Sequence, residues 1–158
     1  MTTLPVRHHP VRVLFVFVAA VVVTAVVGSL FSVSAGDEYL SLQRPSWAPP
    51  AWLFGPVWTV LYGLIALSGW LAWRAGARRG ELTLFGVQLV LNALWTPLFF
   101  GLGWFGAAFA EILVLWLAIV ALIVVFWWRG KAAALLLVPY LAWVSFAAAL
   151  NVSIATLN

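Results

Sequence analysis

The side chains with the clearest chemical potential are tryptophans gathered around a proline-rich segment, RPSWAPPAWLFGPVWTVLY, at residues 44–62. Proline fixes its own φ and restricts the residue before it, so this segment is predicted to be a stiff, non-helical entry to an apolar helix. It delivers Trp47 and Trp52 to the mouth of that helix and places Trp58 one to two turns inside it. Such rings can anchor a protein at a membrane interface or hold a flat ligand, and tryptophan can also be oxidised.

A second group of candidates is polar and lies within an apolar run. Gln88, Asn92 and Thr96 are spaced i, i+4, i+8 and therefore share one face of a helix. Amides are costly in hydrocarbon unless they are paired, so this face either bonds to another helix or lines a pocket. Asn151 has the same two interpretations. Pro97 frees the carbonyl of residue 93, which predicts a kink there.

Glu111 is the one carboxylate well inside a predicted span, about 9 Å below the start of its helix at 1.5 Å per residue. An acid in a membrane is a functional candidate by default. It lacks a second acid with which to form a relay, so a structural role is preferred. The sequence contains no Ser-His-Asp set, no Gly-rich phosphate loop, no cysteine and no metal-ligand spacing, and it predicts no metal site.

Composition decides what kind of protein must position these residues. The 158 residues are 66% hydrophobic and 8% charged, and the mean hydropathy is +1.12. Soluble domains are roughly a quarter charged, so this chain cannot cover its surface in water. The net charge of +4 does not indicate a nucleic-acid partner, because the basic residues punctuate apolar runs instead of forming a patch. The expected partner is the lipid bilayer.

We predict an all-α integral membrane protein, a bundle of five transmembrane helices forming one domain over residues 1–158. The predicted spans are 13–33, 53–74, 82–101, 105–128 and 132–155, with one long outer loop at 34–52. Val33, Ser34 and Ala35 resemble a signal-peptidase site, but the preceding apolar stretch is too long for a signal peptide. A retained first helix is therefore preferred.

Small residues recur every four positions on two of these spans. The first span carries Ala20, Thr24, Gly28 and Ser32, and the last carries Ser145, Ala149 and Ser153. Stripes of this kind let helices approach closely. We expect a homodimer, with either stripe available for the contact between copies.

The loops carry a strong charge bias. Of the eight Lys and Arg residues, only Arg44 lies on the side of the long loop; the others flank the opposite helix ends. Positively charged loops stay in the cytoplasm, which predicts a cytoplasmic N-terminus and an external C-terminus. An apolar helical bundle indicates an inner or cell membrane.

The eleven tryptophans are only partly explained by an interfacial belt. That explanation suits Trp70, Trp73, Trp104, Trp127 and Trp128, which lie near predicted helix ends.

Other tryptophans lie deeper. Trp116 and Trp143 fall near the centres of their spans, and lipid-facing packing is the preferred role for Trp116. For Trp58 and Trp95, belt and pocket interpretations stay open.

Three segments together resemble a known family. PSWAPPAWLFGPVWTVLYG, QLVLNALWTPLFFG and VPYLAWVSFAAALN, in this order over five spans, are similar to the TspO/translocator protein family of tryptophan-rich sensory proteins. The resemblance covers the chain from about Val13 onward. It implies a five-helix bundle, usually dimeric, which binds porphyrins, haem-like tetrapyrroles and other apolar ligands and has no intrinsic cofactor.

The resemblance also implies site residues. Carried over by motif, the pocket lining is Tyr39, Trp47, Trp58, Asn92, Trp95 and Trp143. Some bacterial members are similar to light-dependent porphyrin-degrading catalysts, and the two tryptophans implicated there match Trp58 and Trp143. Tyr140 is not followed by the Lys or Arg of the animal sterol motif, which puts sterol binding through that motif in doubt.

Three functions follow as hypotheses. The first is a receptor or sensor that binds tetrapyrroles and modulates their level or transport. The second is a light-dependent enzyme that degrades porphyrin, with Trp58 and Trp143 as catalytic residues. The third is a small transporter whose substrate path uses Gln88, Asn92 and Glu111. The tryptophan cluster serves the first two equally.

Overall fold

The protein is described by a computed structural model over residues 9–31 and 35–158. Within these residues, five helices are long and apolar enough to cross a membrane, which confirms the predicted all-α, five-span fold class. The long helices are α1 (Pro10–Leu30), α3 (Phe54–Arg74), α4 (Arg79–Thr96), α5 (Phe105–Trp127) and α7 (Val138–Leu157). The shorter elements are α2 (Ala35–Ser41), η1 (Ala51–Leu53), η2 (Pro97–Gly101) and α6 (Lys131–Leu135).

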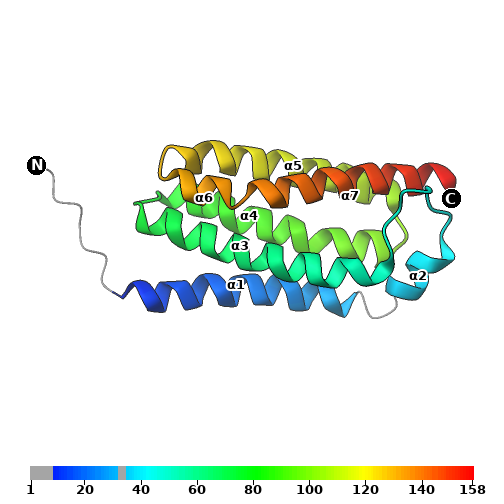
Figure 1. Ribbon diagram of the computed structural model, residues 1–158, viewed down its shortest axis with the longest axis horizontal. Helices are drawn as coiled ribbons and strands as arrows, with labels where there is room; N and C mark the ends of the chain where they lie inside the picture. Colours follow the sequence, from blue (N-terminus) through cyan, green and yellow to red (C-terminus); the bar gives the residue numbers. More distant parts are fainter. Residues whose placement is uncertain (1–8, 32–34) are drawn as a thin grey trace, which may run out of the picture.

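The long helices run side by side in an elongated bundle, with α1 along one side and α5 and α7 along the other (Figure 1). α1 packs against α3 and α4, and α5 packs against α4 and α7. We call the end with α2 and the C-terminus the loop end, and the opposite end, with the α3–α4 and α5–α6 turns, the basic end (Figure 1). The buried core includes Ile65, Leu115, Ile119 and Phe126.

A glycine sets how closely three of these helices approach. A Cβ added at Gly69 on α3 would lie 2.7 Å from the rings of Phe17 on α1 and Phe85 on α4. Those two rings meet edge to face, with centroids 5.3 Å apart. Only a residue without a side chain leaves room for this pair, so Gly69 fixes the packing of α1, α3 and α4.

Some local features differ from what the sequence pattern predicts. The long loop contains the helix α2, which the pattern did not indicate. The fifth predicted span is divided into α6 and α7 just before Pro139, which has no N–H to donate to a continuous helix. At Pro97 the chain continues as a single turn of π-helix, a common way to absorb a freed carbonyl.

The first span is also displaced. It runs over Pro10–Leu30 where 13–33 was predicted. Ser32, and the possible cleavage site at Val33 and Ser34, lie outside the described residues.

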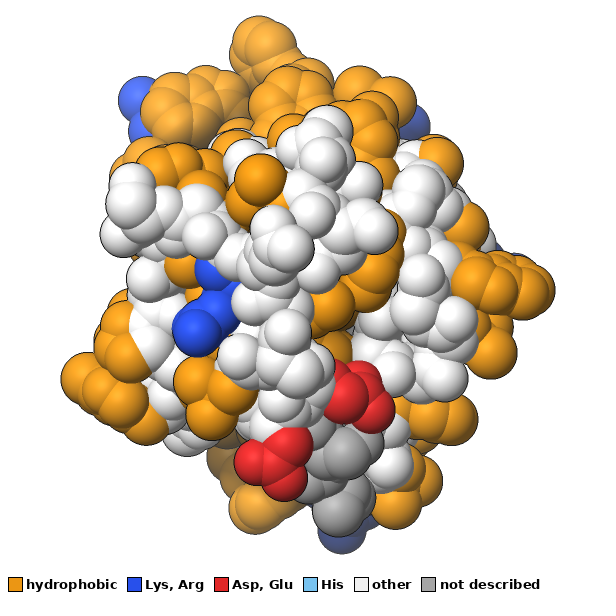
Figure 2. Space-filling model, turned by 90° about the vertical axis from the view of Figure 1, so that its right-hand side faces the viewer, with side chains coloured by type: hydrophobic (Ala, Val, Ile, Leu, Met, Phe, Trp, Pro, Cys, Tyr) orange, Lys and Arg blue, Asp and Glu red, His pale blue; other side chains and the backbone are white. Residues whose placement is uncertain are grey.

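The loop end is tied together by specific contacts. The Tyr39 hydroxyl donates to the Pro49 carbonyl oxygen at 2.8 Å, and the Arg44 guanidinium lies 4.7 Å from the centroid of the Tyr39 ring. Burial raises the pKa of the Tyr39 phenol despite the opposing effect of Arg44, so the hydroxyl stays a donor at neutral pH. Gln43 and Asn158 exchange two hydrogen bonds, at 3.0 and 2.9 Å, which fasten the loop to the end of α7. Figure 2 views this end, with acidic groups near one edge and hydrophobic ones on the flanks.

At the basic end, charges and rings meet as an interfacial belt predicts. Arg129 and Glu81 form an ion pair at 2.8 Å that joins the α5–α6 turn to the start of α4. Arg74 lies over the ring of Trp70, whose Nε1 donates to the Pro10 carbonyl oxygen at 2.8 Å.

Candidate functional site

A cavity of about 360 Å³ lies between the helices near the loop end. Small-molecule sites are typically about 300–1,000 Å³, so this cavity is large enough for a ligand. We call it the aromatic cavity. Its walls come from α1 to α5 and α7, with one residue of η1 and one of η2, and are formed by Ala25, Gly28, Ser29, Ala35, Gly36, Tyr39, Ala51, Phe54, Gly55, Trp58, Tyr62, Asn92, Trp95, Thr96, Phe100, Ile112, Leu115, Trp143, Val144 and Ala147.

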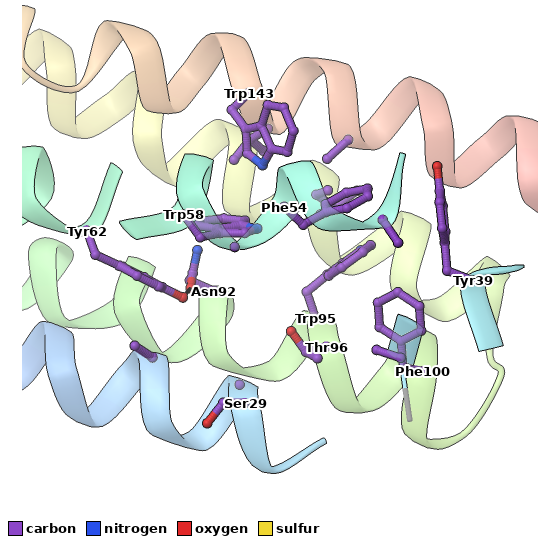
Figure 3. A pocket seen from close by; sticks show the side chains of 18 of the residues that line it. Ser29, Tyr39, Phe54, Trp58, Tyr62, Asn92, Trp95, Thr96, Phe100 and Trp143 are labelled. Carbon is purple, nitrogen blue, oxygen red and sulfur yellow. Dashed lines mark hydrogen bonds between the residues drawn. The ribbon is translucent and has the colours of Figure 1, made fainter. Parts of the chain in front are cut away.

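Three indoles from three different helices face this cavity: Trp58 on α3, Trp95 on α4 and Trp143 on α7 (Figure 3). Phe54 meets Trp143 edge to face, with centroids 5.8 Å apart. Trp58 lies against Tyr62 at 5.3 Å with an interplanar angle of 30°. These rings give the cavity flat apolar walls at different orientations, against which an aromatic group can stack.

The indole N–H groups of Trp95 and Trp143 differ in one decisive respect. Trp95 Nε1 donates to Asn151 Oδ1 at 3.1 Å, and Asn151 Nδ2 in turn donates to the Phe105 carbonyl oxygen at 2.9 Å. Trp143 Nε1 is buried and has no hydrogen-bond partner within the described chain. Buried donors are nearly always paired, so this unpaired N–H is a candidate donor for a ligand in the cavity that the Trp143 residue lines.

A hydrogen-bonded chain runs beside the aromatic walls. Tyr62 Oη donates to Asn92 Oδ1 at 2.8 Å, Asn92 Nδ2 donates to Tyr140 Oη at 3.0 Å, and Tyr140 Oη donates to Gln88 Oε1 at 3.0 Å. Both interpretations of the polar face on α4 therefore hold. Gln88 and Asn92 bond between helices, whereas Asn92 and Thr96 also line the cavity.

Glu111 does not line the aromatic cavity. Both of its carboxylate oxygens are buried, and neither has a hydrogen-bond partner in the parts of the chain that the structure describes. Within the described residues, the structural role preferred from the sequence is therefore not carried by a hydrogen bond from Glu111 to a neighbouring helix.

Of the six residues carried over from the family motifs, Tyr39, Trp58, Asn92, Trp95 and Trp143 line the cavity. Trp47 does not. It is 48% exposed and packs edge to face on Phe146, with centroids 5.7 Å apart.

Sequence reasoning missed several wall residues. Tyr62 could have been found, because it follows Trp58 by four positions on the same helix face. Phe100 had no such signal, because a π-turn sets its direction.

The cavity walls are mainly aromatic and aliphatic, with few polar groups. No cluster of His, Cys, Asp or Glu within the described residues could hold a metal ion. The cavity walls carry hydroxyls, one amide and indoles, and no carboxylate or histidine. Nothing in the wall is suited to proton transfer at neutral pH, whereas the indoles can stack and Trp143 can donate.

Comparison with known proteins shows the family of the chain. The model of the TspO/MBR family matches residues 16–157. Protein CrtK of Rhodobacter capsulatus is 40% identical over 149 residues, covering 90% of this chain and 91% of that protein. The tryptophan-rich protein TspO of Archaeoglobus fulgidus is 42% identical over 145 residues, covering 89% and 94%. The human translocator protein is 40% identical over 131 residues, covering 79% and 78%. The chain is thus a multi-pass integral membrane protein that belongs to the TspO/MBR family.

Proposed function

We propose that this protein is a membrane receptor that binds porphyrins and related tetrapyrroles in the aromatic cavity and so modulates their level or transport. The observation that carries the proposal is the unspent N–H of Trp143 in a cavity walled by Trp58 and Trp95. The indoles offer stacking faces to a macrocycle, and the N–H offers a donor to an acceptor on its edge.

The test is a titration of the purified protein in nanodiscs with protoporphyrin in the dark. We expect saturable quenching of tryptophan fluorescence and a shifted porphyrin absorption band. Trp143→Phe should weaken binding. Trp128→Phe is the matched control, since Trp128 is 83% exposed and far from the cavity walls. Equal affinities for the two variants would contradict the proposal.

A second candidate function is light-dependent degradation of porphyrin. It is supported by the ring contacts of Trp58, which lies 5.3 Å from Tyr62 and 6.1 Å from Tyr140 between centroids. Such neighbours can share an oxidised state with the indole. Illuminating the same complex in the presence of dioxygen tests this function. Bleaching with a new product band that Trp58→Phe abolishes would favour an enzyme, and a stable spectrum would favour a receptor.

We also propose that the chain lies in an inner or cell membrane with its N-terminus in the cytoplasm. Arg74, Arg78, Arg129 and Lys131 all lie at the basic end, whereas the loop end carries Arg44 together with acidic residues of α2. This distribution matches the tendency of Lys and Arg to stay on the cytoplasmic side.

A further inference from the structure

A second hollow lies between α1 and α3, on the side of the bundle that faces lipid. Its volume is about 360 Å³. We call it the α1–α3 groove. It is lined by one face of each helix, at helical spacing: Leu14, Val18, Val21, Val22 and Ala25 on α1, and Thr59, Tyr62, Gly63, Ala66 and Leu67 on α3. Val18, Val22 and Leu67 are 40%, 52% and 37% exposed, so the groove is open to the bilayer.

The groove offers no free hydroxyl donor to a ligand. Its two hydroxyls are both spent within the bundle, because Thr59 Oγ1 donates to the Gly55 carbonyl oxygen at 2.9 Å and Tyr62 Oη donates to Asn92 at 2.8 Å. Every other wall atom belongs to aliphatic side chains, to the Tyr62 ring or to helical backbone. A polar or charged group placed here would lose its hydrogen bonds, so only an aliphatic occupant fits.

The groove and the aromatic cavity share two wall residues, Ala25 on α1 and Tyr62 on α3. The ring of Tyr62 stands between an aromatic compartment with an unspent donor and an aliphatic compartment with none. On α1 the shared wall residue is Ala25, whose side chain is small. Two contiguous compartments of different chemistry indicate one ligand with two different parts.

We propose that the α1–α3 groove holds an aliphatic tail covalently attached to the ring that occupies the aromatic cavity, so that the preferred ligand is a flat macrocycle esterified with an alkyl or isoprenoid chain. This inference rests on the proposed function. From Ala25 to Leu14 the groove follows α1 for about 16 Å toward the basic end, at 1.5 Å per residue. The tail therefore runs from the cavity past the middle of α1 toward the basic end.

A separate lipid molecule is a weaker candidate for the same groove. Lipid chains are as apolar as the groove walls, so a free chain gains little by leaving the bilayer for the groove. A tail attached to a bound ring is held next to the groove, near Ala25 and Tyr62, at a high effective concentration. The covalent link to the ring, and not the apolar surface alone, therefore favours the tail over a free lipid chain.

The test uses a protoporphyrin monododecyl ester whose chain ends in a photoreactive diazirine, with the full-length protein in nanodiscs. Illumination of the diazirine followed by peptide mass spectrometry should place cross-links on residues 14–25 and 59–67. Excess unesterified protoporphyrin should remove them. Gly63→Leu fills the groove, and an added Cβ there meets no heavy atom within 4 Å, so the helix should tolerate it. This variant should lose the groove cross-links and keep its affinity for unesterified protoporphyrin.

Val22→Trp and Val114→Trp form a matched pair, because both valines are 52% exposed but only Val22 lines the groove. The first should lose the cross-links and the second should keep them. Cross-links on α5 or α7 with porphyrin binding intact would overturn the tail assignment and leave the proposed function standing. Groove labelling by a diazirine fatty acid that protoporphyrin does not displace would identify a lipid and also overturn it. Absence of any porphyrin binding would overturn both proposals.

Discussion

Trp143→Phe should lower ligand affinity without destabilising the protein, whereas Trp95→Phe should destabilise it, although both indoles line the same cavity. Phe keeps an aromatic face and removes the N–H. Trp143 Nε1 has no partner within the described chain, whereas Trp95 Nε1 donates to Asn151 at 3.1 Å. The first substitution therefore removes an unpaired donor, and the second leaves the Asn151 carbonyl oxygen without the bond from Trp95.

The magnitudes follow from the cost of unpaired polar groups. Leaving Asn151 Oδ1 unsatisfied should lower the free energy of unfolding of Trp95→Phe by about 1–3 kcal/mol. Trp143→Phe should leave the stability of the ligand-free protein unchanged or slightly higher. Its ligand affinity should fall by up to about tenfold, since one net hydrogen bond is worth about 0.5–1.5 kcal/mol and 1.4 kcal/mol is a factor of ten.

The assay is thermal unfolding in detergent, with and without protoporphyrin, combined with dark titrations in nanodiscs. Retention of the edge-to-face contact with Phe54 in Trp143→Phe keeps the cavity wall in place, so a loss of affinity reports the donor. The reasoning is refuted if Trp143→Phe destabilises the ligand-free protein as much as Trp95→Phe does. It is also refuted if Trp143→Phe binds protoporphyrin as tightly as the parent.

Three further outcomes are expected. Gly69→Val should destabilise the bundle by about 1–3 kcal/mol, because its Cβ would overlap two rings, and Phe17→Leu in the same chain should restore part of the loss in thermal unfolding. Tyr140→Phe removes the hydroxyl that joins Asn92 to Gln88 and should lower the unfolding temperature in detergent. An unfolding temperature equal to that of the parent would show that these hydrogen bonds do not stabilise the protein. In this cysteine-free protein, Ala149→Cys should cross-link two copies through α7 in membranes, whereas Thr24→Cys, 6% exposed within the bundle, should not.

The cross-linking prediction rests on where the small residues of the first span lie in the bundle. Thr24 is buried, and a Cβ on Gly28 would lie 3.7 Å from Thr96 Oγ1 on α4. Thr24 and Gly28 of that stripe therefore pack inside the bundle, while Ser145 and Ala149 on α7 remain exposed. We therefore propose that a homodimer uses a face other than α1.

The sequence was sufficient for the features that depend on composition and periodicity. Long apolar runs with short polar turns specify five spans, and the i, i+4 spacing of Gln88 and Asn92 specifies a shared face. The family motifs located Trp58 and Trp143, which do line one cavity.

Periodicity could not reveal features that depend on packing between segments far apart in the chain. Trp95 and Trp143 both lie in membrane spans, yet the Trp95 N–H donates to Asn151 whereas the Trp143 N–H has no partner within the described chain. The sequence carries no sign of that difference. Trp47 belongs to the strongest motif but lies outside the cavity, because its ring packs on Phe146 at the loop end.

The polar groups of the aromatic cavity fall into two kinds: those that bond within the protein and one that is left unpaired. Tyr39, Tyr62, Asn92 and Trp95 each spend a donor on fixing the bundle or the loop, which holds their apolar faces in place around the cavity. Among the wall's aromatic rings and amide, the buried donor that the described chain leaves unused is Trp143 Nε1. A ligand that accepts this single bond is oriented by it, whereas stacking alone would allow the ring to rotate in its plane. In the complex that we propose, the same bond would determine which edge of the macrocycle points toward Tyr62 and the α1–α3 groove.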